Sequence, residues 1–239
     1  MTINVLDHGF VRLVEHMGDD KAPVRAARIS YGEETKGDEA DKKLLHYLIK
    51  HKHHTPLEMV VYEFHVKCPI FVARQWMRHR IGSFNEISGR YVEIKNEFYI
   101  PETYRVSAEY SKQGSQEPTE AFIEKINAEG NCDYFESHEE WNEVAKEGLY
   151  FVCFQAYSEY VRLIKMGVAK EMARMVLPVN IYTQFYWCIN MRSLFNFLNL
   201  RLDSHAQWEI QQYAQALLEI VKDKNPWLAE AFDLYVRDK

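Results

Sequence analysis

Arginine, histidine and glutamine residues are concentrated in one short segment of the chain. It reads Arg74-Gln75-Trp76-Met77-Arg78-His79-Arg80 and is followed by Ser88-Gly89-Arg90. Guanidinium groups gathered this closely would repel one another unless an anion lies between them. The dianionic phosphate of a nucleotide suits them, because a guanidinium group binds phosphate oxygens two at a time. Ser88 adds a hydroxyl group, and Gly89 lets backbone amides approach a phosphate. The alternative is a solvated basic helix face with no ligand.

A second group of polar residues lies further along the chain. Arg174 is surrounded by methionine and valine, while Arg192, Asn196 and Asn199 recur at helical spacing, with Arg201 just beyond them. Buried charges need partners. This group therefore indicates a second ligand rich in phosphate or carbonyl groups, or internal salt bridges with some of the 35 acidic residues.

Histidines and cysteines suggest chemistry that their spacing does not support. His51, His53 and His54 stand at the end of an expected helix and point in different directions, with no accompanying carboxylate at ligand spacing, so we predict no metal site. His53 and Thr55 could still touch a ligand. Cys68, Cys153 and Cys188 are expected in the core rather than as nucleophiles. The common dinucleotide and nucleotide-triphosphate motifs are absent from the sequence, as is the serine hydrolase motif.

Hydrophobic periodicity predicts the elements that position these residues. Helices are expected over 41–52, 70–80, 138–166, 169–176, 192–201 and 205–222, strands over 60–66 and 179–190, and a polar loop over 81–90. A helix over 70–80 would place Arg74 and Arg78 on one face, and Gln75 and His79 on another. The pattern indicates a helix-rich α+β fold in a single domain over residues 1–239.

The charge is distributed unevenly along the 239 residues, which carry a net charge of −6. Segment 105–147 holds 4 basic and 11 acidic residues and is predicted to be an acidic surface insertion, whereas 67–92 holds 5 basic residues and one acidic residue. A small basic focus in an acidic protein favours a compact anionic ligand over nucleic acid. No apolar run reaches the roughly eighteen residues of a membrane span, and no secretory signal is visible, so we expect a cytoplasmic protein.

The arginine segment resembles a known family. Arg78-His79-Arg80, seven residues and then Ser88 match the RHRx7S signature of the flavin-dependent thymidylate synthases. His53-His54-Thr55-Pro56-Leu57-Glu58, the run from Asn196 to Arg201 and the run from Asp203 to Trp208 are also similar to that family. The similarity covers roughly 1–104 and 148–223.

The resemblance implies an α+β homotetramer with a small, mainly antiparallel sheet and active sites shared between subunits. The implied reaction is the reductive methylation of dUMP to dTMP, with methylenetetrahydrofolate as carbon donor, FAD as hydride carrier and NAD(P)H as reductant. It implies dUMP contacts at Gln75, Arg78, Glu86, Ser88, Gly89, Arg90, Arg174 and Arg201. It implies cofactor contacts at His53, Thr55, Arg78, His79, Arg80, Glu86, Asn190, Arg192 and Asn196.

The resemblance also assigns one catalytic role. Arg201 matches the residue that activates the uracil ring, because a guanidinium group at the C2 carbonyl and N3 would stabilise an ionised ring without a cysteine adduct. Three alternatives stay open at this point. They are another flavin or nucleotide enzyme on the same scaffold, a nucleic-acid-binding module using 67–92, and a purely structural oligomer.

Overall fold

The computed structural model describes residues 1–32, 34–108, 114–130 and 132–237. Contacts divide the chain into two compact units, which we describe separately. Unit 1 comprises Met1–Ile87 and Thr183–Lys239, and unit 2 comprises Ser88–Tyr182. The expectation of one domain over 1–239 stays a prediction.

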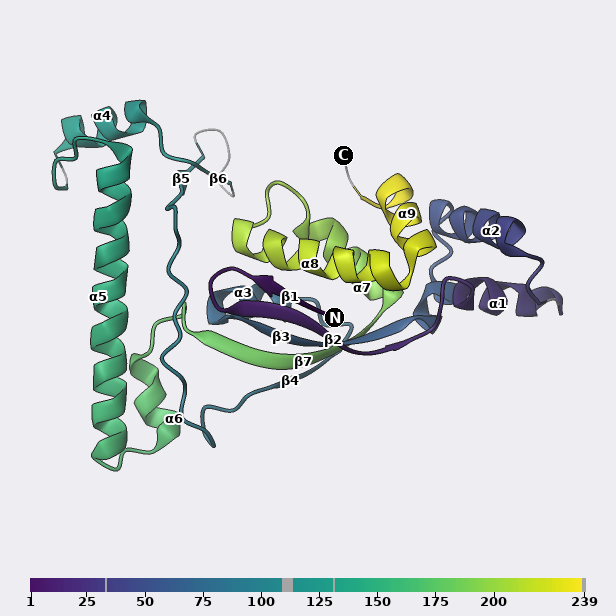
Figure 1. Ribbon diagram of the computed structural model, residues 1–239, viewed down its shortest axis with the longest axis horizontal. Helices are drawn as coiled ribbons and strands as arrows, with labels where there is room; N and C mark the ends of the chain where they lie inside the picture. Colours follow the sequence, from purple (N-terminus) through teal and green to yellow (C-terminus); the bar gives the residue numbers. More distant parts are fainter. Residues whose placement is uncertain (33, 109–113, 131, 238–239) are drawn as a thin grey trace. The chain divides into compact units, whose positions relative to one another are not determined.

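Unit 1 is built on a five-stranded sheet (Figure 1). Its strands are β1 (Thr2–Val5), β2 (Gly9–Met17), β3 (Val61–Pro69), β7 (Tyr182–Asn190) and β4 (Ser83–Glu86), in that order across the sheet. The pairs β1–β2, β2–β3 and β4–β7 are antiparallel. Alternation along β3 buries Tyr62, Phe64 and Val66 completely, as expected for a strand with one polar face.

Helices cover one face of this sheet. They are α3 (Ile70–Trp76), α7 (Met191–Arg201) and α8 (Trp208–Lys224), and Figure 1 shows α7 and α8 over the strands. At the end of the sheet lie α1 (Ala22–Arg28), α2 (Asp38–Lys50), α9 (Pro226–Tyr235) and two 3₁₀ helices, η1 (Ile29–Tyr31) and η2 (Thr55–Met59). Aromatic rings fill the layer between sheet and helices, and Trp76 packs against both Trp187 and Phe197.

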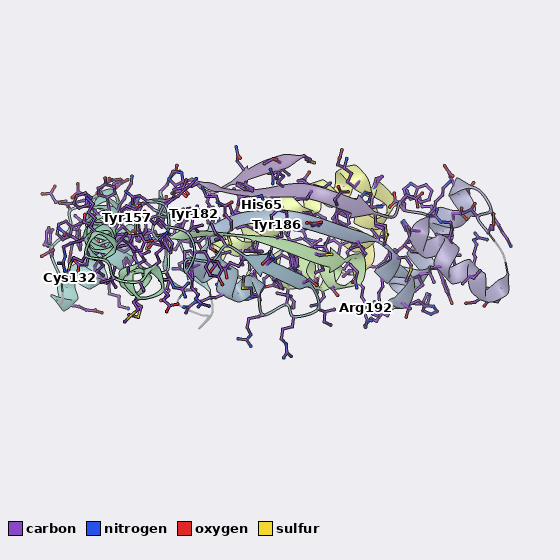
Figure 2. All side chains as sticks on the ribbon, turned by 90° about the horizontal axis from the view of Figure 1, so that it is seen from below. His65, Cys132, Tyr157, Tyr182, Tyr186 and Arg192 are labelled. Carbon is purple, nitrogen blue, oxygen red and sulfur yellow. The ribbon has the colours of Figure 1, made fainter. Side chains whose placement is uncertain are left out.

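The opposite face of the sheet carries polar and aromatic side chains. His65 on β3 stacks on Tyr186 of β7, with ring centroids 4.8 Å apart and planes within 4° of parallel (Figure 2). His65 also contacts Arg12 and Gln184 through its two ring nitrogens. The alternation that buries Trp187 therefore places Tyr186 on the uncovered face.

Unit 2 contains the longest helix of the described chain. This helix, α5 (His138–Lys165), starts at Ser137, whose hydroxyl group accepts the Glu140 amide as an N-cap. Around it lie α4 (Glu120–Glu129), α6 (Lys170–Ala173), the 3₁₀ helix η3 (Arg174–Val176) and a small sheet of β5 (Val106–Ser107) and β6 (Ser115–Gln116). Within the described residues, no helix combines the length and the apolar character needed to cross a membrane.

Most of the predicted elements are confirmed, and the fold is helix-rich α+β with an antiparallel sheet. The expected loop over 81–90 is wrong in part, because β4 pairs with β7 through Ser83–Glu86. The expected helix over 70–80 ends at Trp76. The segment 105–147 contains β5, β6, α4 and the start of α5, with 109–113 and 131 outside the described residues, and its role as an insertion stays a prediction.

Candidate active site

A cavity of about 630 Å³ in unit 1 collects many of the predicted site residues. Arg78, His79, Arg80, Arg192, Asn196 and Arg201 all line it. Four of these side chains are arginines, and the described residues that line the cavity include no aspartate or glutamate. Arg78 and Arg80 form no ion pair in the described part of the chain. Guanidinium groups gathered in a cavity whose described lining has no carboxylate suit an anion with several oxygens.

The end of α3 places the Arg78-His79-Arg80 segment beside this cavity. The Met77 amide makes the last i→i−4 bond, to the Ala73 carbonyl, whereas the His79 amide turns to the Trp76 carbonyl at 3.0 Å. The fully buried indole of Trp76 anchors this point. The helix therefore stops before Arg78, and the predicted sharing of a helix face by Arg74 and Arg78, and by Gln75 and His79, is wrong.

One face of α7 supplies the other wall of the cavity. Arg192, Asn196 and Asn199 lie three or four residues apart and all line the cavity, as the sequence predicted. Arg192 donates a hydrogen bond to Glu58 Oε1 at 2.7 Å, so its charge is partly balanced. Asn190 stands at the N-cap of α7, where its Oδ1 accepts the Ser193 amide, and it does not line the cavity.

Arg201 and His79 form the best defined contact in the cavity. The Nε of Arg201 donates a hydrogen bond to His79 Nε2 at 3.0 Å. Burial and the neighbouring Arg201 charge lower the pKa of His79 to about 4. Burial and the nearby Arg78 also lower the pKa of Arg201, but an arginine stays charged in proteins. His79 is therefore neutral near pH 7 and holds a cationic Arg201 in place.

Besides Asn190, four further predicted contacts in unit 1 lie outside the cavity lining. His53 and Thr55 are exposed, and it is the neighbouring His54 that lines the cavity. Gln75 donates a side-chain hydrogen bond to Gln207. Glu86, at the end of β4, accepts a hydrogen bond from the Thr183 hydroxyl group at 2.6 Å. The sequence analysis placed no ligand contact at His54, although His54 belongs to the 53–58 segment that is similar to the family.

The remaining predicted substrate contacts come together in unit 2. An added Cβ on Gly89 would lie 3.2 Å from Cδ and 3.4 Å from an Nη atom of Arg174, so the backbone at Gly89 runs close to the Arg174 side chain. The Arg90 amide donates to Ser88 Oγ at 3.3 Å, and the Arg90 side chain pairs with Glu171 at 2.9 Å. Arg174 forms no ion pair among the described residues. Two arginines, a hydroxyl group and a glycine thus form a second group whose chemistry suits an anion.

The cysteines do not form a nucleophilic site in the described residues. Cys68 and Cys153 are buried, and burial raises the pKa of both thiols, which disfavours the reactive thiolate. Cys188 is exposed on the uncovered face of β7, so its predicted core position is wrong. Cys188 alternates along β7 with the buried Trp187 and Ile189. Its apolar sequence neighbours did not predict which face of the sheet its side chain would take.

Comparison with known proteins gives a consistent result. The family model described as "Thymidylate synthase complementing protein" matches residues 12–227. A flavin-dependent thymidylate synthase of Thermosipho africanus is 53% identical over 97% of this chain and 94% of its own. One from Thermus thermophilus is 50% identical over 98% of this chain and 78% of its own. Among solved structures, the UMP/dUMP methylase PolB of Streptomyces cacaoi, bound with 5-Br dUMP, superposes with a TM-score of 0.80 at 33% identity, covering 99% of both chains.

Proposed function

This chain belongs to the family of flavin-dependent thymidylate synthases, and from that premise we propose that it reductively methylates dUMP to dTMP. Methylenetetrahydrofolate would donate the carbon and NAD(P)H the electrons. The names of the relatives support the flavin, and the name of the PolB methylase supports the nucleotide.

The arginine-rich cavity of unit 1 is the observation that carries the proposal. Its donors fit FAD chemically, since Arg78, Arg80 and Arg192 suit a pyrophosphate and the Asn196 amide suits the edge of a ring. Bound FAD supplies hydride-transfer chemistry. The residues around it orient the ring, bind the phosphates and keep the reacting region apart from bulk water.

Arg201 is the proposed catalytic residue. A guanidinium group against the C2 carbonyl and N3 of uracil would stabilise negative charge on the ring and make C5 more nucleophilic. Neutral His79 would fix the direction of this guanidinium group by accepting its Nε–H at 3.0 Å. This route needs no cysteine, which agrees with the buried Cys68 and Cys153.

We place the phosphate of dUMP on the Ser88, Gly89, Arg90 and Arg174 group of unit 2. Arg90 and Arg174 would neutralise the dianion, and Ser88 would donate its hydroxyl hydrogen. The proposal also gives Gln75, Arg78 and Glu86 of unit 1 a role in binding dUMP. His53, Thr55, Arg80, Asn190 and Asn196 complete the cofactor site.

A homotetramer with shared active sites is part of the same proposal. Helix α5 leaves the side chains of Tyr150, Phe151, Val152 and Phe154 largely exposed, at 54–65% of their surface. Consecutive exposed apolar residues around one helix indicate a surface that other subunits cover. Neither a nucleic-acid partner nor a metal enters this proposal, and the cytoplasmic location stays a prediction.

A visible absorption spectrum tests the proposal first. The protein is incubated with FAD, desalted and scanned with and without dUMP. A retained flavin band that shifts on adding dUMP would support a common site, and dTMP formation from methylenetetrahydrofolate and NADPH would establish the reaction. A protein that stays colourless under these conditions would overturn the flavin assignment.

UMP is the second candidate substrate, because the PolB relative is named for both nucleotides. Parallel assays with dUMP and UMP separate the two. We expect turnover of dUMP, since the relatives near 50% identity are named thymidylate synthases.

A further inference from the structure

A second cavity, of about 510 Å³, lies between α2 and α9 in unit 1 and plays no part in the site described above. Figure 1 shows the two helices packed together at one end of the sheet. Residues three and four apart on α2 form most of the lining, so a single helix face borders the cavity. We call it the α2–α9 groove; it is lined by Lys42, Lys43, His46, Tyr47 and Lys50 on α2 and Tyr235 on α9.

The groove carries more basic than acidic groups. Its three lysines face only one acidic lining residue, Glu39. Lys42 lies 2.5 Å from Glu230, and Lys43 lies 2.9 Å from Glu39 in a pair that is highly exposed and therefore weak. Lys50 has no ion-pair partner in the residues that the structure describes. Its charge is available to an anionic ligand.

Aromatic rings border the same groove. The ring of Tyr47 is 53% exposed, and its centroid lies 4.3 Å from that of His51 and 5.9 Å from that of His53. Tyr235 packs edge-on against His46 at 5.7 Å. The Nε2 atom of His46 is buried and has no hydrogen-bond partner in the described structure. A groove with flat ring faces and a lysine without an ion-pair partner among the described residues suits a ligand part that is both planar and anionic.

Adjacent residues of α2, and of the end of α9, border the groove and the arginine-rich cavity. Ile49 and Val236 line the cavity, while their chain neighbours Lys50 and Tyr235 line the groove. The two cavities therefore lie within one helix diameter, ~10 Å, of each other. A ligand with a ring system and a long anionic tail can span that separation. Under the proposed function, both cosubstrates have this form. The folate carries glutamyl carboxylates, and the reduced dinucleotide carries phosphates.

We propose that the α2–α9 groove binds the anionic tail of a cosubstrate whose ring system occupies the neighbouring cavity. This inference rests on the proposed function, because the cosubstrates are those of the proposed reaction. Lys50 provides the principal charge, and Tyr47 provides a face for the planar part of the tail.

Equilibrium binding to the purified, FAD-supplied protein tests this proposal without requiring turnover. Two probe pairs are compared: pteroylpentaglutamate with pteroylmonoglutamate, and NADP⁺ with NAD⁺. We expect the more anionic member of one pair to bind about fivefold or more tightly, and we expect Lys50→Glu to abolish that preference. The matched control is Lys222→Glu, an exposed lysine on α8 outside both cavities, which should keep it.

Each result decides a different question. Loss of the pentaglutamate preference in Lys50→Glu assigns the groove to the folate tail, and loss of the NADP⁺ preference assigns it to the phosphate. Equal binding within both pairs, or a preference that survives both Lys50→Glu and the milder Lys50→Gln, overturns the groove proposal. A separate assay of dTMP formation by the unmodified protein tests the proposed function, so the two can fail independently.

Discussion

The two compact units differ in how much of their own apolar surface they bury. In unit 1, Trp76, Trp187 and Phe197 are fully buried in one aromatic layer between sheet and helices. In unit 2, α5 runs for 28 residues and buries only Cys153 and Tyr160. A helix that buries so little would be marginal alone in water, since most helical stability in proteins comes from tertiary packing. Unit 1 can therefore be stabilised from within, whereas α5 leaves apolar side chains that the proposed homotetramer would cover.

The polar residues of the two units also differ in how deeply they are buried. Around the cavity of unit 1, Arg201 and His79 are partly buried and hold each other in a fixed geometry. In unit 2, Arg90 and Arg174 are exposed, and Arg90 is balanced by the equally exposed Glu171. Partial burial strengthens electrostatic interactions, which suits the ring activation proposed for unit 1, whereas exposed side chains suit the phosphate binding proposed for unit 2.

The largest expected effect comes from removing a phenylalanine in each unit. Phe197→Ala in unit 1 should lower the free energy of unfolding by about 3–5 kcal/mol, because its ring is fully buried. Phe151→Ala, at a side chain that is 61% exposed, should change the stability of the dissociated chain by only about 0.5 kcal/mol. It should instead weaken self-association. Denaturant unfolding and sedimentation velocity measure the two quantities. Equal destabilisation by both variants, with self-association unchanged, would contradict the difference in apolar burial between the two units.

Arg201→Ala is expected to lower kcat for dTMP formation by about 100-fold or more, since it removes a donor to developing negative charge. Flavin absorbance and melting temperature should stay close to those of the unmodified protein. Arg74→Ala is the matched control, because Arg74 is exposed on α3 and does not line the cavity. Unchanged turnover in Arg201→Ala would exclude Arg201 from the mechanism.

Arg90→Ala tests unit 2 in the same way. Loss of the Arg90 guanidinium group should weaken dUMP binding about tenfold, equivalent to ~1.4 kcal/mol, and leave FAD binding unchanged. Titration with dUMP by calorimetry and FAD retention after desalting measure the two affinities. Parallel losses of both ligands would mean that Arg90 has a structural role.

The smallest effects concern two histidines with opposite pKa shifts. Burial and the charge of Arg201 lower the pKa of His79 to about 4. A hydrogen bond with Glu120 raises the pKa of His138 above its ordinary value of 6.5. Slight desolvation opposes this increase, and the charge of Glu139 adds to it. The stability associated with neutral His79 is present above pH 6.5 and is lost as the pH falls towards 4. The stability contributed by protonated His138 is present below pH 6.5 and is lost as the pH rises through the raised pKa of His138.

Ring titrations by NMR check both directions. His79 should still be neutral at about pH 5, and His138 should still be protonated above its unfolded value. Hydrogen exchange of the α4 amides should quicken as His138 loses its proton. His138→Gln provides the control, because it cannot titrate. A shift in the same direction for both histidines would contradict the difference between the units.

Local sequence patterns predicted a large part of the secondary structure of this protein. Period-two alternation identified β3 and β7, period 3.6 identified α2, α5, α7 and α8, and the spacing of Arg192, Asn196 and Asn199 identified one wall of the cavity. The RHRx7S signature, together with the similar segments over 53–58, 196–201 and 203–208, identified the family. Each of these features depends on side chains that are neighbours in sequence, so the sequence contains them directly.

Other features depend on contacts between distant segments, and only the tertiary structure decided them. Helix α3 ends at Trp76 because its indole is fixed among rings from β7 and α7, and β4 forms because β7 offers it an edge. The exposure of Cys188, the closeness of Gly89 to Arg174 and the orphaned Nε2 of His46 beside α9 have the same origin. Burial is a property of the assembled fold, so the sequence specified which groups were available and the packing decided which of them meet.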